Sequence, residues 1–481
     1  MNMKPEILWK YFLEILEIPR PSKKEVKIRA YLVAFAEQHK LECLVDATGN
    51  VLIRKPATKG YENRKTVILQ SHMDMVCEKN NDVVFDFDKD PIQYEIVDGW
   101  IKGKGTTLGA DNGIGVAAQL AILASNDIEH GDLECLFTVD EETGLTGAFG
   151  LQPNWLKGEI LLNLDSEDDG QFFIGCAGGI DTVITLPYTF ENLPNVYKCY
   201  EIVVKGLSGG HSGDDINKGR ENALKLCNRV LFAGIQEFDL KLNQFIGGNL
   251  RNAIPREASA KIAVPAEKST AFEKYVQDFY ALVKKELPLT EPNVVVQLQR
   301  IDPFTEALPD KETEELVKAL TAVPHGVIRM ASDIPNFVET STNLAAIKMQ
   351  DGEILITTSQ RSSIESRKFE VANQVAAAFE LIGAKAKHGE GYPGWTPNIH
   401  SPILNVILDA FKRLYNEDGQ ALAIHAGLEC GLISEKYPNM DMVSYGPTMR
   451  GVHSPDERMD IFTVERFWDL TLEVLRNIPK R

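Results

Sequence analysis

The sequence lacks the features of a disulfide-stabilised, secreted or membrane-spanning protein. Its seven cysteines are scattered and never form a Cys-x-x-Cys pair, which argues against a disulfide framework and against a zinc–thiolate site. No apolar run approaches the roughly 18 residues that a membrane span requires. The first residues lack the apolar core and the small-residue cleavage site of a signal peptide. These absences predict a cytoplasmic protein with free thiols.

An excess of basic residues is also missing. Lysine and arginine together number 51, against 69 aspartate and glutamate residues, and the formal net charge is -18. Nucleic acids and anionic membrane surfaces select basic faces, so we expect neither among the partners. The glycine-rich segment at residues 103–115 contains no Gly-Lys-Ser/Thr and no GxGxxG at a helix entrance, which argues against a nucleotide site.

The length of 481 residues exceeds one ordinary hydrophobic core, so we expect two domains. Two helices are predicted on either side of residues 19–21, and Ser22 with Glu25 matches a capping box for the second helix. From about residue 195 strands and helices alternate, and residues 312–383 repeat this pattern more loosely. We interpret these as two related α+β units of one inserted domain. The predicted domain segments are residues 1–190, 191–383 and 384–481, of which the first and third form one domain.

Two short apolar runs end at acidic residues. Residues 133–139 precede Asp140, Glu141 and Glu142, and residues 160–164 precede Asp165. Apolar runs of this length are typical of buried strands. In α/β sheets, functional side chains lie at the carboxyl ends of the strands. Carboxylates this close repel one another, so a neutralising partner is needed. The simplest partner is a metal ion.

Other candidate ligands lie at similar places in the sequence. His72 and Asp74 follow a predicted strand and point to the same side of it if the chain stays extended. Asp111 stands at the entrance of a predicted helix, and His453 lies in a polar loop. Each also fits a structural role alone, such as a helix N-cap for Asp111, a turn residue for Asp140 or a solvated acid for Glu141. Their joint occurrence favours the metal interpretation.

Two imidazoles with several carboxylates suit a pair of divalent ions, most simply zinc, with manganese or cobalt as alternatives. We expect Asp111 to bridge the ions, with Glu142 and Asp165 as terminal ligands and one histidine on each ion. The three carboxylates leave a net positive charge, which favours a bridging hydroxide as nucleophile. Glu141 then remains as the general base.

The motifs SHMD, GADNG, DEETG, NLDSED and GVHSPDE occur in this order and together resemble the co-catalytic zinc exopeptidases, which include aminoacylases, carboxypeptidases and dipeptidases. The segments IPRPS, CAGG, GGHSG, RNAIPREA and HAGLECG resemble the Xaa-His dipeptidase branch. The resemblance covers essentially the whole chain. It implies an α/β fold, with a three-layer catalytic domain (a mixed sheet between helices) and an inserted α+β lid domain.

The resemblance also implies roles at the metal centre. His72 and Asp165 hold one ion, Glu142 and His453 hold the other, and Asp111 bridges them. Asp74 orients His72, and Glu141 is the base. The family has a cis peptide bond after the bridging aspartate, so a cis bond is expected at Asp111–Asn112.

In the lid, His211 of GGHSG matches the histidine that stabilises the tetrahedral oxyanion, and Asn252 matches a second polar substrate contact. Arg361 matches the arginine that binds the substrate carboxylate, although a solvated strand charge is an equally good interpretation. The chain departs from the Gly-Gly-Thr segment of many relatives at residues 425–429, so His425 and Glu429 receive no role. The long second unit of the lid can replace a partner subunit, which leaves monomer and homodimer open.

The sequence therefore predicts a two-metal hydrolase that cleaves dipeptides with a free C-terminal carboxylate, including Xaa-His and β-Ala-His. One alternative is an N-acyl amino acid deacylase or carboxypeptidase that uses the same site. Another is a catalytically silent binding protein, but every ligand and the base are present in the sequence.

Overall fold

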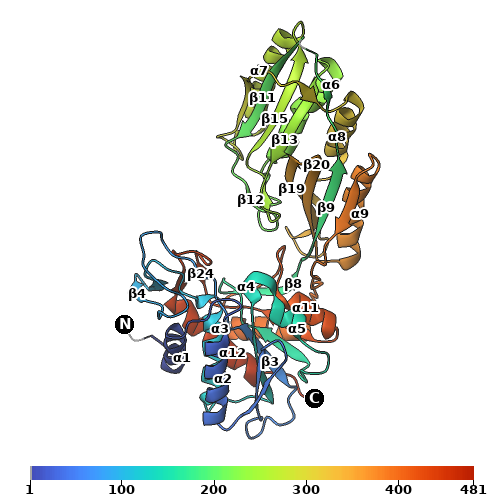
Figure 1. Cartoon of the computed structure of the whole chain (residues 1–481). Helices are drawn as coiled ribbons and strands as arrows, with labels where there is room; N and C mark the ends of the chain where they lie inside the picture. The colour runs from blue at the N-terminus through green and yellow to red at the C-terminus, as the bar shows by residue number, and fades with distance from the viewer. Residues whose placement is uncertain (1–2, 195) are drawn as a thin grey trace. The chain divides into compact units, whose positions relative to one another are not determined.

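The computed structural model describes residues 3–194 and 196–481, which form two compact units (Figure 1). The first unit comprises the chain up to Cys176 together with Trp395–Ala423 and Leu428–Arg481. The second comprises Ala177–Gly394 and Ile424–Gly427. Its limits lie outside the predicted 191–383 because β9 (Gly178–Pro187) pairs with β20 (Glu353–Ser362) on one side and β21 (Lys385–His388) on the other.

The first unit is built on an eight-stranded mixed sheet. Its central strands are parallel, and every residue of three of them is buried, as expected for strands covered on both faces. In spatial order the strands are β1 (Glu42–Val45), β2 (Val51–Lys55), β6 (Leu133–Thr138), β3 (Val67–His72), β7 (Ile160–Asn163), β23 (Asp441–Ser444), β8 (Gln171–Cys176) and β22 (Gln420–Ile424).

Helices cover both faces of this sheet. The helices on one face share a single apolar cluster with alternate strand residues such as Leu69, Phe137 and Leu162. They are α1 (Glu6–Leu16), α2 (Val26–Gln38), α3 (Ala110–Ala124), α10 (Pro402–Tyr415) and α12 (Ile461–Arg476). The intervening residues, for example Ile68 and Leu136, are buried on the other face. That face packs against the segment after α5 (Thr146–Gly150) and against α11 (Glu429–Lys436). The three-layer prediction is confirmed.

A smaller four-stranded sheet in the same unit carries the last candidate ligand. Its strands in spatial order are β24 (Met449–Arg450), β25 (Arg458–Asp460), β5 (Trp100–Gly103) and β4 (Tyr94–Val97). His453 lies in the loop between β24 and β25 with a positive φ of 60°.

The second unit contains one continuous antiparallel sheet. It joins the two predicted α+β units where β13 pairs with β19, so these units do not form separate sheets. The strands are, in order, β16 (Val295–Arg300), β11 (Tyr197–Lys205), β15 (Ala258–Pro265), β13 (Lys241–Gly247), β19 (Val338–Gln350), β20, β9 and β21, with β18 (Gly326–Met330) beside β19. Two short pairs, β10 (Glu191–Asn192) with β17 (Glu306–Ala307) and β12 (Gly210–His211) with β14 (Ala253–Ile254), complete the strands.

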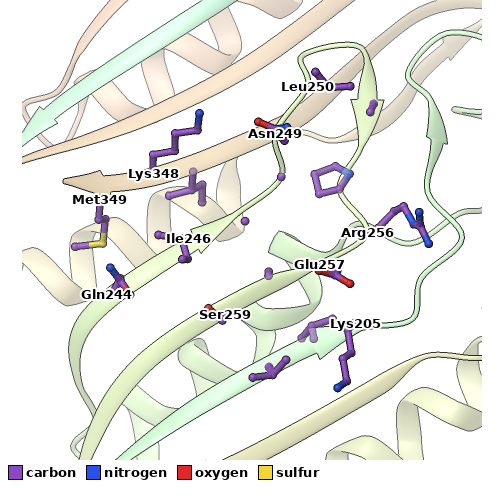
Figure 2. Close-up of a pocket in the computed structure, with 18 of the residues that line it drawn as sticks. Lys205, Gln244, Ile246, Asn249, Leu250, Arg256, Glu257, Ser259, Lys348 and Met349 are labelled. Atoms are coloured by element: carbon purple, nitrogen blue, oxygen red, sulfur yellow. The ribbon is translucent and has the colours of Figure 1, made fainter. Parts of the chain in front are cut away.

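Four helices share one apolar cluster with this sheet: α6 (Ala223–Glu237), α7 (Ser269–Glu286), α8 (Asp310–Ala322) and α9 (Glu365–Glu380). Strands β11, β13, β15 and β19 also border a groove of about 1130 Å³ (Figure 2). The groove is lined by polar side chains such as Lys205, Gln244 and Lys348, which explains the polar residues between the apolar ones along these strands. Within the described residues, no helix is long and apolar enough to cross a lipid bilayer.

Asn222 links helix α6 to the sheet of the second unit. Its buried side chain accepts hydrogen bonds from the N–H groups of Leu224 and Lys225, and it donates one of 2.8 Å to the carbonyl of Leu344. Asn222→Ala removes the cap and leaves buried groups without partners, which costs about 2 kcal/mol. We expect the melting temperature to fall by about 4–8 °C in a thermal unfolding experiment. The exposed Asn249→Ala is the control, and equal melting temperatures would contradict the prediction.

Candidate active site

Most of the predicted ligands follow three neighbouring strands. The strands lie in the order β6, β3, β7, so their carboxyl ends are adjacent. His72 is the last residue of β3, Glu142 lies in the short helix α4 (Glu141–Gly144) after β6, and Asp165 follows β7. Asp111 comes from the first turn of α3, and His453 from the small sheet.

These five side chains form two groups that share Asp111. His72 Nε2 lies 3.1 Å from Asp111 Oδ1 and 3.5 Å from Asp165 Oδ1. His453 Nε2 lies 3.1 Å from Asp111 Oδ2 and 3.0 Å from Glu142 Oε2. In each group the potential ligand atoms lie within 4.8 Å of one another, a spacing that can hold a metal ion. The two carboxylate oxygens of Asp111 thus face different histidines.

Glu141 lies beside these groups. Its carboxylate engages in no hydrogen bond or ion pair with the described residues, although His72, Glu141 and Glu142 also come within ligand distance of one another. Burial raises the pKa of Glu141, and the nearby negative charges of Asp165 and Glu142 raise it further. A carboxyl group of this kind can exchange a proton near neutral pH.

The residues present suit divalent cations. Two imidazoles and three carboxylates converge, and the Oε1 atom of Glu142 is buried without a hydrogen-bond partner in the described part of the chain. An orphaned carboxylate oxygen is costly to bury, so Glu142 Oε1 is a suitable ligand atom for a cation.

The protonation of the two histidines reflects the surrounding negative charge. Hydrogen bonds to Asp111 and Glu142 raise the pKa of His453 to about 11. Burial lowers the pKa of His72, but the charges of Asp165 and Asp111 outweigh burial and hold it well above its usual value. Burial raises the pKa of Asp165 to about 8. A metal ion therefore has to displace protons from this site.

Asp74 fixes both the histidine and the acidic turn. Its Oδ1 lies 3.3 Å from His72 Nδ1 and accepts the N–H of Glu141, while Oδ2 accepts the N–H of Glu142 and the hydroxyl of Ser22. The capping-box prediction is therefore wrong, because the Ser22 side chain binds Asp74 and makes no bond to helix α2. One carboxylate thus aligns a candidate ligand with the turn that carries Glu141.

The loop before Asp111 is held by Glu457, which the sequence analysis did not identify. The buried Glu457 carboxylate accepts the N–H groups of Leu108, Gly109, Ala110 and Asp111 at 2.7–3.3 Å. The backbone of α3 is not helical at Asp111 and Asn112, and the Asp111 carboxylate faces His72 and His453, so it does not act as the predicted N-cap. The Asp111–Asn112 peptide bond is cis, as predicted. The only sequence signal for Glu457 is its place four residues after His453.

The sequence also gives no signal for the role of Arg20, because Arg20 lies between two prolines that indicate only the end of a helix. Its buried guanidinium donates to the carbonyls of Met73, Asp74 and Gly109 at 3.2, 2.7 and 2.5 Å. It therefore ties the segment after β3 to the loop before Asp111.

Glu429, which received no role, belongs to a buried network beneath the strand ends. Its Oε2 accepts hydrogen bonds from Gln70 Nε2 at 2.6 Å and from Thr138 Oγ1 at 2.7 Å. Asn163 Nδ2 donates to Gln70 Oε1 at 2.5 Å. The network joins β3, β6 and β7, and burial raises the pKa of Glu429 to about 7. It fixes the ends from which the ligands project.

The remaining predicted residues belong to the second unit. His211 pairs with Ala253 between β12 and β14, and the N–H of Ser212 donates to the carbonyl of Asn252 at 2.8 Å, so Asn252, just before β14, lies opposite the end of β12. Arg361 on β20 is only 7% exposed, so the interpretation as a solvated strand charge is wrong.

Comparison with known proteins finds similarity over the whole chain. The profile of Peptidase family M20/M25/M40 matches residues 68–477. Over 480 residues the chain is 45% identical to the cytosol non-specific dipeptidase of Escherichia coli (strain K12), which covers 100% of this chain and 99% of that protein. The aminoacylhistidine dipeptidase of Vibrio alginolyticus matches with a TM-score of 0.94 and 44% identity, over 100% of this chain and 98% of that one. The aminopeptidase PepT of Bacillus cereus shares the fold at 16% identity, with a TM-score of 0.57 over 99% of each chain.

Glu457→Gln places an amide where four N–H groups need an acceptor, so the loop before Asp111 should lose its fixed position. We expect the affinity for divalent cations to fall about 10- to 100-fold, as measured by competition with a chelating dye. The control is Asp456→Asn at the neighbouring exposed position. It removes the same negative charge and should bind metal like the wild type. Equal affinities for the two variants would contradict the role of Glu457.

Because both histidines are held protonated, binding of divalent cations should release protons. The pKa of His453 is about 11, so proton competition weakens steadily as the pH rises, and affinity should increase between about pH 6 and 9. Calorimetric titration in two buffers of different ionisation enthalpy measures the release. His453→Gln should release fewer protons, and a binding heat that is independent of the buffer would refute the prediction.

Proposed function

The chain belongs to peptidase family M20/M25/M40, and we propose that it is a cytoplasmic two-metal dipeptidase that acts on dipeptides with a free C-terminal carboxylate. The observation that carries this proposal is the pair of ligand groups that share the two oxygens of Asp111. Support for dipeptides comes from the dipeptidases named above, which match over their full length at 44–45% identity. The cytosolic location in the name of the Escherichia coli relative supports the cytoplasm.

We assign His72 and Asp165 to one ion, Glu142 and His453 to the other, and Asp111 to both. Zinc suits these ligands best, and manganese and cobalt accept the same set. When bound, the ions supply an activated water and polarise the scissile carbonyl. Asp74 holds the His72 ring so that Nε2 faces the site, because its carboxylate lies beside Nδ1.

Glu141 is assigned to proton transfer between the attacking water and the leaving amine. Its carboxylate is free of hydrogen bonds to the described residues, and its N–H is fixed by Asp74, so the side chain is positioned but uncommitted. We assign it the proton of the attacking water, which it then delivers to the nitrogen of the leaving amino acid. The carbon–nitrogen bond breaks as that nitrogen accepts the proton.

The second unit supplies groups for the substrate. We assign His211 to the oxyanion that develops on the scissile carbonyl, and Asn252, just before β14, to a second polar contact. Arg361 is assigned to the substrate carboxylate, for which a planar guanidinium offers two parallel donors. Its burial supports this assignment, because a buried guanidinium needs an anionic partner.

A pair of identical substitutions on adjacent residues tests the mechanism. Glu141→Gln should retain two metal ions per chain and lose at least about 1000-fold in kcat for β-Ala-His, because the proton acceptor is removed. Glu142→Gln should lose metal as well as activity, because it removes a ligand. Metal content by elemental analysis and dipeptide hydrolysis are measured on the same samples.

Treatment of wild type with a chelator should abolish hydrolysis, and zinc, manganese or cobalt should restore it when added singly. N-acetyl amino acids and longer peptides, assayed in parallel, test the deacylase and carboxypeptidase alternatives. Full activity of Glu141→Gln, or of the chelated protein, would refute the proposed mechanism.

A further inference from the structure

Arg361 is a buried cation without an anionic partner. No carboxylate of the described residues lies within ion-pair distance of its guanidinium, and its Nε atom is buried without a hydrogen-bond partner. Its one described hydrogen bond is from Nη1 to the hydroxyl of Tyr392 at 3.0 Å. Because an unpaired buried charge is costly, the site is built for an anion that comes from elsewhere.

The strands on either side of Arg361 determine its neighbours. On β9 the directly opposite residue is Gly179, and a Cβ atom there would lie 2.7 Å from the Tyr392 ring, so the glycine makes room for Tyr392. On β19 the directly opposite residue is Ser341. Side chains of such cross-strand pairs share one face of the sheet, with Cβ atoms about 5 Å apart.

Ser341 brings His425 to this face. His425 Nε2 lies 2.7 Å from Ser341 Oγ, and the edge of Phe337 packs against the ring at 6.3 Å between centroids. The His425 side chain is 6% exposed, and its Nδ1 atom is buried without a hydrogen bond of normal geometry among the described residues, although the backbone of Val338 also interacts with the ring. Two orphaned polar atoms, Arg361 Nε and His425 Nδ1, thus belong to side chains linked through one cross-strand pair.

The ring of His425 is neutral, and its contact with Ser341 suits one tautomer. Burial lowers the pKa of His425 to about 3, and the charge of Arg361 lowers it further. The Ser341 hydroxyl can donate its proton to His425 Nε2, and in this arrangement Nε2 acts as acceptor. The hydrogen of the neutral ring is then on Nδ1. His425 therefore offers an N–H donor beside the guanidinium and adds no second charge.

We propose that His425 Nδ1–H is a second donor, beside Arg361, to the C-terminal carboxylate of the dipeptide, and that it sets the preference for a free carboxylate over an uncharged end. The assignment rests on the proposed function. A carboxylate has two oxygens with several lone pairs, so it can accept the guanidinium and a separate N–H donor together. Ser341 acts as the positioning residue that fixes the ring and its tautomer.

The test compares two substrates, Ala-Ala and Ala-Ala amide, in the full-length protein loaded with zinc. We measure kcat/KM for both in wild type, His425→Leu and His425→Asn. Leucine fills the space without a donor, whereas asparagine places an N–H close to the position of Nδ1. The control is His388→Leu in the same unit, since that ring also contacts a strand hydroxyl, Thr182 Oγ1 at 2.9 Å.

We expect His425→Leu to lower kcat/KM for Ala-Ala about 10- to 100-fold, mainly through KM, and to leave the amide almost unchanged. The acid-to-amide ratio therefore falls by the same factor, and it does not depend on the fraction of correctly folded protein. His425→Asn should retain most of the wild-type acid-to-amide ratio of kcat/KM, and His388→Leu should leave this ratio unchanged.

An unchanged ratio in His425→Leu, or an equal fall in the His388→Leu control, would overturn the assignment and leave the dipeptidase function intact. Failure of zinc-loaded wild type to cleave Ala-Ala and other dipeptides would instead overturn the proposed function, and this assignment with it.

Discussion

The mutual repulsion of carboxylates at adjacent strand ends is the constraint on which the first unit depends. Besides the two histidines, the structure orients the carboxylates in and around this cluster with donors that carry no charge. Backbone N–H groups bind Asp74 and Glu457, and the side chains of Gln70 and Thr138 bind Glu429. The buried cation nearby, Arg20, donates to carbonyl oxygens and to none of these carboxylates. Neutral donors orient negative charge without cancelling it, so the charge remains available to divalent cations.

The features that the sequence predicts are those with a local signal. Apolar runs that end in acids located the strand ends, whereas the three-layer order was implied by the resemblance of the motifs to a known family. The groups that position the ligands have no such signal, because they act across long separations. Glu457 binds N–H groups almost 350 residues earlier in the chain. Ser22 shows the same limit, since its capping-box spacing is correct but tertiary contact with Asp74 takes the hydroxyl.

The two units differ in which buried polar atoms lack hydrogen-bond partners. In the first, most polar atoms around the ligands have partners within the chain, and the exceptions include carboxylate oxygens of Glu142 and Glu429. In the second, the orphaned atoms near Ser341 belong to donors, Arg361 and His425. One unit is thus short of positive charge and the other short of an acceptor. The carboxylate of the proposed substrate is an acceptor of the kind that the second unit lacks.

The strand order of the first sheet has a consequence for biosynthesis. β23 lies between β7 and β8, although it follows them in sequence by more than 260 residues, with the whole inserted unit between. His453 comes later still, whereas the other four ligand candidates are complete by Asp165. A chain emerging from the ribosome therefore exposes an open sheet and an incomplete ligand set until the inserted unit has been synthesised. The set of candidate ligands is therefore completed only at the last stage of translation.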